Sequence, residues 1–199
     1  MNRINVVVGV TGASGAPIAV RIVERLAETG QLAIHLVVSP SALRTLEHET
    51  DRGALERMTV LATVNHAHDD IGASIASGSV PTAGMIVAPC SMRTLGAIAH
   101  SIGDNLIIRA ADVHLKERRK LVLVARETPL HLGHLRTMGA VTEMGAIVMP
   151  PVPAFYHRPQ SVEEIVDQIA ARAIDLLGLP IPPLARAWNP DVESECILT

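Results

Sequence analysis

Charged residues recur inside apolar sequence across residues 104–127, which read DNLIIRAADVHLKERRKLVLVARE. Arg109, Asp112 and Lys116 are three and four residues apart, so a helix would place them on one face. Because apolar residues surround Arg109 in the sequence, a buried guanidinium there needs an anionic partner. Asp112 and an anionic ligand are both candidates for that partner.

Arg126 and Glu127 directly follow the apolar run LVLVA at residues 121–125. Residues at the carboxyl end of a parallel strand commonly meet a ligand. These two side chains therefore form either a structural ion pair or a bidentate phosphate contact beside a proton-transferring carboxylate. The three cations at residues 118–120 are assigned to a solvated helix end, where the helix dipole favours positive charge.

Two junctions between an expected strand and an expected helix are rich in glycine or hydroxyl groups. TGASG, residues 11–15, can bring backbone N–H groups and the Ser14 hydroxyl to an anion, or it can be a tight turn. PCSMRTL, residues 89–95, is a second junction that can bind an anion at the start of a helix, although Ser91 could serve only as a helix N-cap. With the SGS turn at residues 77–79, the junctions suggest a ligand with a phosphate and polar ring groups, such as FMN.

The stiff segment PPVPAFYHRP, residues 150–159, is expected to position Tyr156, whose hydroxyl can bind an anion. Arg172 is a further cation in an apolar setting. His131 and His134 resemble a metal pair, but no acidic residue has matching spacing and HLGH can simply cap a helix. We therefore expect no metal.

Short β-branched runs alternate with helical patterns along the chain, which predicts an α/β, Rossmann-like three-layer fold with a mainly parallel sheet of about six strands. The expected strands are Ile4–Val10, Ile34–Ser39, Met85–Ala88, Leu121–Ala125 and Ala146–Met149, with Met58–Thr63 as a peripheral sixth. The expected helices are Pro17–Thr29, Ser41–Glu49, Met92–His100, Asn105–Lys120, Leu130–Met144 and Ser161–Leu177. We expect one domain over residues 1–179 and an extended C-terminal arm over residues 180–199.

Composition narrows the class of protein. A net charge of −3 argues against a nucleic-acid surface, and 199 residues with 48% hydrophobic content can bury one substantial core. Cys90 and Cys196 have no disulfide or zinc spacing. Without a signal-peptide pattern or an apolar run approaching 18 residues, we expect a cytoplasmic protein that binds no membrane.

These motifs together resemble the UbiX-type flavin prenyltransferases, from about residue 3 to Trp188. The resemblance rests on TGASG, SGS, PCSMRTL, NLIIRAADVHLKERRKLVLVARETPL and PPVPAFYHRPQS. It implies a flavoprotein fold, a homododecamer and the joining of a dimethylallyl group from dimethylallyl phosphate to reduced FMN. The product would serve UbiD-type decarboxylases. Val80 departs from the family, since many members have Phe after SGS.

The resemblance also implies a role for each matching residue. The FMN-binding positions are Gly12, Ala13, Ser14, Ser39, Ser91, Met92, Arg93, Thr94 and Arg109. The positions that hold the prenyl phosphate are Lys116, Arg126, Tyr156 and Arg172, and Trp188 borders the prenyl group. Ser14, Glu49, Glu127 and Lys116 are implicated in catalysis, with Glu127 handling the proton lost at ring closure. The resemblance further implies that parts of the site come from neighbouring subunits.

Two alternatives stay open at this point. A flavin-dependent decarboxylase of the cysteine type has a PASANT-like segment where this chain has PCSMRTL. A non-catalytic flavin-binding subunit of an aromatic-acid decarboxylase has no need of a second anion site. The sequence leaves the pathway, quinone synthesis or aromatic-acid breakdown, and the choice of mono- or diphosphate undecided.

Overall fold

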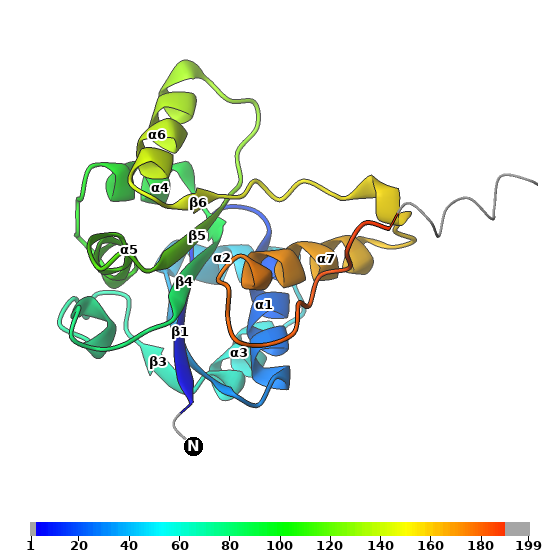
Figure 1. Cartoon of the computed structure of the whole chain (residues 1–199), viewed down its shortest axis with the longest axis horizontal. Coiled ribbons are helices and arrows are strands. Elements are labelled where there is room, and N and C mark those ends of the chain that lie inside the picture. The colour runs from blue at the N-terminus through cyan, green and yellow to red at the C-terminus, as the bar shows by residue number, and fades with distance from the viewer. Residues whose placement is uncertain (1–2, 190–199) are drawn as a thin grey trace, which may run out of the picture.

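A parallel sheet of six strands forms the centre of the computed structural model, which describes residues 3–189 (Figure 1). The strands lie in the order β3-β2-β1-β4-β5-β6, and every neighbouring pair is parallel. Their bounds are β1 Ile4–Val10, β2 Leu32–Val38, β3 Val64–His66, β4 Gly84–Cys90, β5 Lys120–Ala125 and β6 Ile147–Val148. The chain reverses its direction of winding between β1 and β4, a switch point where such sheets bind ligands.

Helices cover both faces of the sheet. Their bounds are α1 Ala16–Glu28, α2 Pro40–Glu49, α3 Ala54–Leu61, α4 Met92–Ala99, α5 Leu106–Lys116, α6 Leu132–Glu143 and α7 Val162–Asp175, with 3-10 turns at Ser74–Ala76 and Phe155–His157. One buried cluster joins the sheet to α1, α2, α3 and α7, and the other joins it to α4, α5 and α6. The predicted three-layer α/β fold is therefore confirmed.

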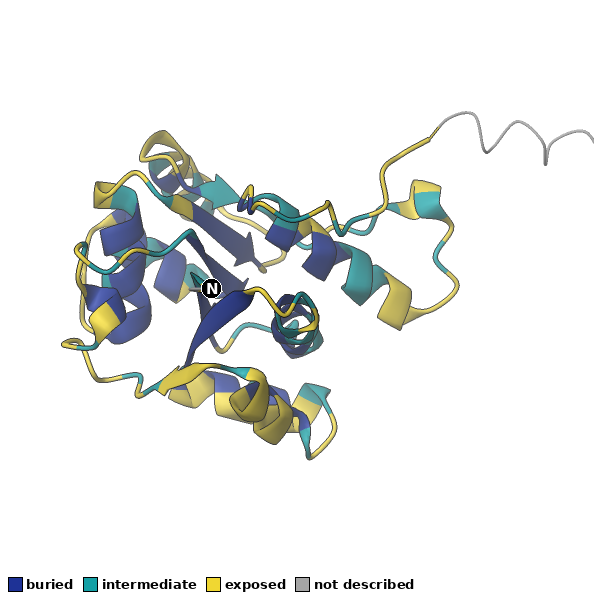
Figure 2. Ribbon diagram, turned by 60° about the horizontal axis from the view of Figure 1, so that its bottom comes forward, coloured by how far each residue is buried: buried dark blue, intermediate teal, exposed yellow. Residues whose placement is uncertain are grey.

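The central strands are buried on both sides, as their unbroken apolar runs predict. All seven residues of β4 are buried, and Val6, Val7 and Val8 of β1 are fully enclosed. Figure 2 shows these strands in the buried colour between helices whose outer faces are exposed. A core with few aromatic rings thus rests on many aliphatic contacts.

One predicted element is wrong. Met58–Thr63 is not a strand, because residues 58–61 end α3 and the edge strand β3 comes later, at Val64–His66. Ala54 and Met58 of α3 are buried while Val60 is 76% exposed. One buried residue every four positions is the period of a helix, not of a strand.

The helix predicted to reach Lys120 is shorter than expected. α5 ends at Lys116, and Arg118 takes a left-handed conformation with φ of 57°. The N–H groups of Arg118 and Arg119 then bond back to the carbonyls of Leu115 and His114. Such a turn closes a helix C-terminus and starts β5 without a longer loop.

Residues 180–189 of the predicted C-terminal arm lie beside α7, and residues 190–199 lie outside the described part (Figure 1). Within residues 3–189, no helix has the length and apolar character needed to cross a membrane. The division into a domain of residues 1–179 and an arm stays a prediction.

A polar chain crosses the sheet near its edge. The Nδ1 atom of His35 lies 2.9 Å from Nε2 of His66, and the Nε2 atom of His35 lies 3.3 Å from Oδ1 of Asn5. His35 is only 8% exposed. Burial lowers the pKa of both His35 and His66 below the ordinary value for histidine.

This histidine pair predicts a loss of stability at acid pH. Because their folded pKa values are depressed, the native state binds fewer protons than the unfolded chain and unfolding takes up protons. The contribution of the neutral pair is complete above about pH 6.5 and is lost as the pH falls toward the depressed values.

Urea unfolding between about pH 7.5 and pH 5 measures this effect. We expect the midpoint of a His35→Gln, His66→Gln double variant to fall less steeply with pH than that of the parent. Equal slopes for the two proteins would contradict the assignment.

Candidate active site

A pocket of about 590 Å³ lies at the switch point between β1 and β4. The segments that follow the two strands both line it, together with the starts of α2, α4 and α5. Its lining includes the sequence-predicted residues Gly12, Ser39, Ser91, Arg93 and Thr94. The parallel-sheet rule therefore places these residues correctly.

Three helices begin at this pocket, and each has a side-chain N-cap. The Ser39 hydroxyl accepts a hydrogen bond from the N–H of Ala42, at 3.2 Å. Ser91 Oγ caps α4 in the same way, and Asn105 Oδ1 caps α5. Helix N-termini carry partial positive charge and unpaired N–H groups, so their convergence creates a site for an anion.

Two close contacts fix the geometry of the pocket. Thr11 Oγ1 donates to the carbonyl of Pro89 at 2.6 Å and accepts from the N–H of Ser91 at 2.9 Å. This hydroxyl ties the segment after β1 to the segment after β4. Gly12 approaches α2 so closely that an added Cβ would collide with Ser41 Cβ.

The N-terminus of α1 is filled differently from what the TGASG motif predicts. Glu49 Oε2 accepts hydrogen bonds from the N–H groups of Gly15, at 2.7 Å, and Ala16, at 2.9 Å. A carboxylate of the protein thus takes the place that we expected a phosphate to take. The half-buried Ala13 and Ser14 lie in this loop, and Ser14 shares a second hollow with Glu49.

Glu49 is held in its ionised form. Burial opposes its charge, but interactions with the Ser14 hydroxyl and the N–H groups of Gly15 and Ala16, aided by the Arg126 charge, outweigh that effect. Together they lower the pKa of Glu49 below the ordinary value. The structure therefore links three predicted site residues, Ser14, Glu49 and Arg126, by electrostatics.

A second predicted group gathers in a pocket of about 410 Å³ beside α7. Tyr156 comes from the 3-10 turn, Arg172 from α7 and Trp188 from the C-terminal segment. Apolar side chains, including Met149 and Val152, complete the walls. A cation, a phenol and an indole over an apolar floor can accept a small molecule with an anionic head and an apolar tail.

Other predicted residues lie apart from both pockets. Arg109 Nη1 pairs with Asp112 Oδ2 at 2.9 Å, so the intrahelical partner that the sequence allowed is the one observed. Met92 is partly buried against the hydrophobic cluster under α4 and α5. Arg126 and Glu127 are exposed where β5 ends.

Lys116 lies near the amino ends of the strands, at the opposite end of the sheet from the switch-point pocket. α5 begins at the pocket and ends at Lys116, close to the start of β5. There Lys116 pairs with Glu117 and packs against Gly78, where an added Cβ would collide with the Glu117 carboxylate. The SGS turn and Lys116 thus lie together, but away from the other predicted residues of the same chain.

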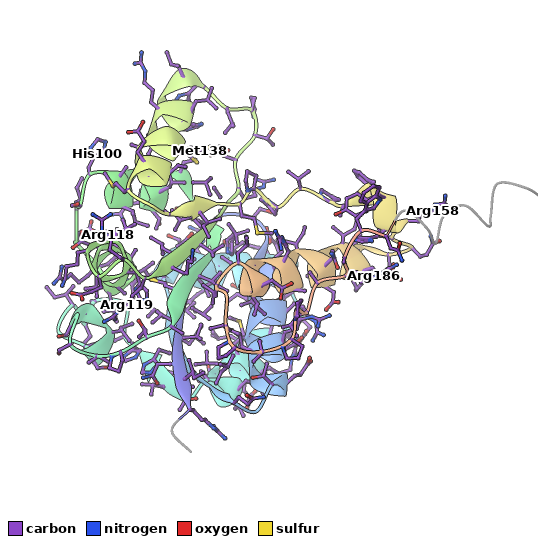
Figure 3. The ribbon with its side chains drawn as sticks, in the orientation of Figure 1. His100, Arg118, Arg119, Met138, Arg158 and Arg186 are labelled. Carbon is purple, nitrogen blue, oxygen red and sulfur yellow. The ribbon has the colours of Figure 1, made fainter. Side chains whose placement is uncertain are left out.

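Arg119 is not the solvated charge that the sequence suggested. Its Nη1 donates to the carbonyl of Val80 at 2.8 Å and to Thr82 Oγ1 at 3.1 Å, and its Nη2 donates to the carbonyl of Gly78 at 2.5 Å. Thr82 also meets Nε2 of the fully buried His114. Figure 3 shows Arg118 and Arg119 at the α5 side of the sheet, away from Arg158 and Arg186.

Sequence reasoning missed several polar residues of the switch-point pocket. His68, Asp69 and Asp104 line it, and the His68 carbonyl accepts the N–H of Leu106 at the start of α5. Burial, reinforced by the Arg93 charge, lowers the pKa of His68. The polar run HAHDD at residues 66–70 was the available signal.

The histidine pair of HLGH serves as a helix cap. His131 Nδ1 accepts the N–H groups of Gly133, at 3.0 Å, and His134, at 3.4 Å. The two rings stack with centroids 3.6 Å apart. The capping role is therefore the one that the geometry shows.

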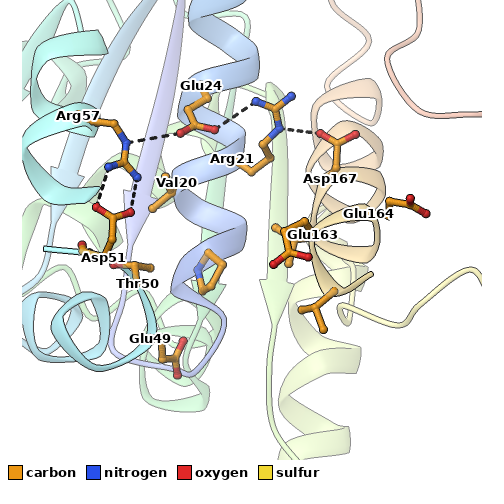
Figure 4. A pocket seen from close by; sticks show the side chains of 13 residues that line it. Val20, Arg21, Glu24, Glu49, Thr50, Asp51, Arg57, Glu163, Glu164 and Asp167 are labelled. Carbon is orange, nitrogen blue, oxygen red and sulfur yellow. Dashed lines mark hydrogen bonds and ion pairs between the residues drawn. The ribbon is translucent and has the colours of Figure 1, made fainter. Parts of the chain in front are cut away.

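A further cleft, of about 640 Å³, lies between α1, α3 and α7 (Figure 4). Its arginines are already engaged: Arg57 pairs with Asp51 and Glu24, and Arg21 pairs with Glu24 and Asp167. The hydrogen bonds from Arg57 hold the pKa of Asp51 at about 2. These ion pairs join three helices, and the cleft presents no spare cation for an anionic ligand.

Comparison with known proteins gives concordant results. The model of the flavoprotein family matches residues 1–174. The flavin prenyltransferase UbiX of Thauera aromatica is 52% identical over 190 residues, which are 96% of each chain.

Two solved structures are similar over nearly the whole chain. AnUbiX (PadA1), in complex with FMN and dimethylallyl pyrophosphate, has a TM-score of 0.88 and 45% identity, covering 94% of this chain and 98% of its own. A dodecameric FMN-dependent UbiX-like decarboxylase from Escherichia coli O157:H7 has a TM-score of 0.88 and 46% identity, covering 94% and 100%.

The contacts of Arg119 predict a specific effect of its removal. Arg119→Met deletes three hydrogen bonds to residues 78–82. A hydrogen bond from a charged donor contributes up to about 3 kcal/mol to the free energy of unfolding. We expect amide exchange in residues 78–82 to accelerate. The exposed neighbour provides the control: Arg118→Met should leave that exchange unchanged, and equal effects of both variants would contradict the assignment.

Proposed function

We propose, since the chain belongs to the flavoprotein family and within it to the UbiX-type flavin prenyltransferases, that its site transfers a dimethylallyl group from dimethylallyl phosphate to reduced FMN. The observation that carries the proposal is the convergence of three capped helix N-termini on one pocket at the switch point. We propose neither a cysteine-type decarboxylase nor a non-catalytic subunit, because the chain is 52% identical in sequence to a named flavin prenyltransferase.

The switch-point pocket fits the phosphate of FMN. The first-turn N–H groups of α2 and α4 supply hydrogen bonds and partial positive charge without a buried counter-ion. Gly12, Ser39 and the segment Ser91–Thr94 would hold the phosphate and its neighbouring groups, with Ala13 and Ser14 in the loop that follows Gly12. Bound there, reduced FMN would supply the electron-rich ring atoms to which the allylic carbon bonds.

The pocket beside α7 fits the second substrate. Arg172 and Tyr156 would bind the phosphate, and Trp188 would border the prenyl group. Arg126 would add charge from the end of β5. As the phosphate departs, these donors neutralise its growing charge, so we propose that the reaction needs no metal.

Glu127 is proposed as the group that accepts the ring proton. Its exposed carboxylate stands at the end of β5, next to Arg126. Ser14 and the ionised Glu49 are proposed to pass that proton on, because Glu49 contacts the loop that carries Ser14. Glu49 also keeps this loop fixed while the proton moves.

Neighbouring copies of the chain are proposed to complete the site. Lys116 lies shortly before the start of β5 and Glu127 lies just after its end, so one chain alone cannot bring these two side chains to one substrate. Arg109 is likewise not among the residues that line the switch-point pocket and is paired with Asp112. Assembly into a dodecamer, the state named for the Escherichia coli O157:H7 relative, would supply Lys116 and Arg109 from adjacent copies.

Delivery of the product to a UbiD-type decarboxylase is also a proposal, resting on the family. A cytoplasmic location remains a prediction from the sequence.

The first test is product formation. We expect anaerobic incubation of the protein with reduced FMN and dimethylallyl phosphate to add the mass of one prenyl group to the flavin. The yield should be unchanged by EDTA, because protein cations rather than a metal stabilise the leaving phosphate. A flavin of unchanged mass would refute the transferase, and loss of yield in EDTA would refute metal independence.

The second test asks whether two copies share a site. Glu127→Gln should keep FMN binding but slow ring closure, and so the formation of finished prenyl-FMN, by about 100-fold or more, the usual contribution of a general base. Lys116→Ala should raise KM for dimethylallyl phosphate or lower turnover.

Oligomers assembled from both variants together should contain sites with neither defect and so regain activity. Each variant mixed with itself is the control. A mixture no more active than its parts would show that Lys116 and Glu127 do not act in sites shared between copies.

A further inference from the structure

The C-terminal strap, residues 183–188, lies along α7 and supplies one wall of the pocket that holds Arg172 (Figure 1). Leu184 packs against the core cluster under α7. Trp188 is 62% exposed, so burial of its ring does not by itself fix the strap. Other contacts must hold residues 184–188 in place.

Asp175 makes two of these contacts. Its Oδ1 accepts the N–H of Leu184 at 2.8 Å, and its Oδ2 accepts the N–H of Ala185 at 3.0 Å. Both carboxylate oxygens thus bind consecutive backbone donors. Hydrogen bonds to an ionised acceptor are stronger than those between neutral groups, so this contact anchors the beginning of the strap.

Gln168 anchors the next residue of the strap. Its Oε1 accepts the N–H of Arg186 at 3.0 Å, and its Nε2 donates to the carbonyl of the same residue at 3.0 Å. Nε2 also lies 3.3 Å from Nε2 of His157, beside Tyr156. One amide therefore contacts both the strap and the turn that carries the phenol.

The two anchors flank Arg172 on the helix. Gln168, Arg172 and Asp175 are four and three residues apart, so they share one face of α7. All three line the same pocket as Tyr156 and Trp188. The hydrogen bonds of Gln168 and Asp175 thus determine where the indole lies relative to the guanidinium.

We propose that Gln168 and Asp175 are positioning residues that fix the C-terminal strap over Arg172 and thereby shape the binding site for the prenyl phosphate. The proposal rests on the proposed function, which assigns that substrate to this pocket. Neither side chain needs to touch the substrate, since both act through backbone groups of the strap. Their loss should weaken binding of dimethylallyl phosphate while leaving the switch-point pocket, with which this pocket shares no lining residue, intact.

Trp188 makes the strap directly observable, because it is the only tryptophan in the chain. The unmodified protein is to be compared with Asp175→Ala and Gln168→Met, and with Glu163→Gln as a control. Glu163 is an exposed carboxylate in the first turn of α7, outside this pocket. The Gln168 variant keeps its length and hydrophobic contacts, so it tests the hydrogen bonds even if Asp175→Ala folds poorly.

The first measurement is independent of activity. We expect both anchor variants to show lower Trp188 fluorescence anisotropy and faster amide exchange at residues 184–186, with the control unchanged. Asp175→Asn, which retains one acceptor oxygen, should be intermediate. Unchanged anisotropy and exchange in both anchor variants would overturn the proposal that these residues hold the strap.

The second measurement is steady-state kinetics with each substrate varied. The anchor variants should raise KM for dimethylallyl phosphate about tenfold, the equivalent of one good hydrogen bond, and leave FMN affinity unchanged. A freed strap with unchanged KM would overturn the positioning role. A parent protein that forms no prenyl-FMN would instead refute the proposed function, while the anisotropy result would still stand.

Discussion

The shared direction of the six strands is the constraint on which the rest of the structure depends. In a parallel sheet, all strands end on the same side of the sheet, and the helix that follows a strand begins on that side. The reversal between β1 and β4 opens the space into which α2, α4 and α5 direct their N-termini. The positive ends of these helices repel one another, and an anion between them would offset that repulsion. A fourth helix, α1, receives its anion from within the chain, through Glu49.

The same topology also divides the predicted site. A helix that starts at the carboxyl ends of the strands must finish near their amino ends. α5 therefore carries Lys116 away from the pocket that its own N-terminus lines. Gly78, Glu117 and Arg119 then fix the surroundings of Lys116 with short contacts. Our proposal that another copy of the chain presents its substrate there accounts for a lysine on a surface away from the other predicted site residues.

Much of the fold could be predicted because buried strands have a simple signature. The run from Ile4 to Val10 has no polar side chain except that of Asn5, and its predicted bounds are those observed. Met58–Thr63 gave a wrong prediction because a short apolar run fits either period, and only burial reveals that Met58 faces inward while Val60 does not. The site was predictable where residues follow strands, as with Ser39 and Ser91. It was not where partners are distant backbone carbonyls: the bonds of Arg119 to Gly78 and Val80 have no sequence pattern.

The two pockets that we propose to bind anions differ in a way that suits the proposed reaction. At the switch point, the backbone dipoles of three helix N-termini would do most of the binding, and these are fixed by the sheet and carry no mobile charge. Such a site suits a phosphate that stays bound throughout turnover. Beside α7, Arg172 and Tyr156 present exposed side chains to the pocket, and hydrogen bonds of Gln168 and Asp175 hold the strap that forms one of its walls. A leaving phosphate must be stabilised as its charge grows and then released, and exposed side chains suit that sequence of events better than converging helix N-termini do.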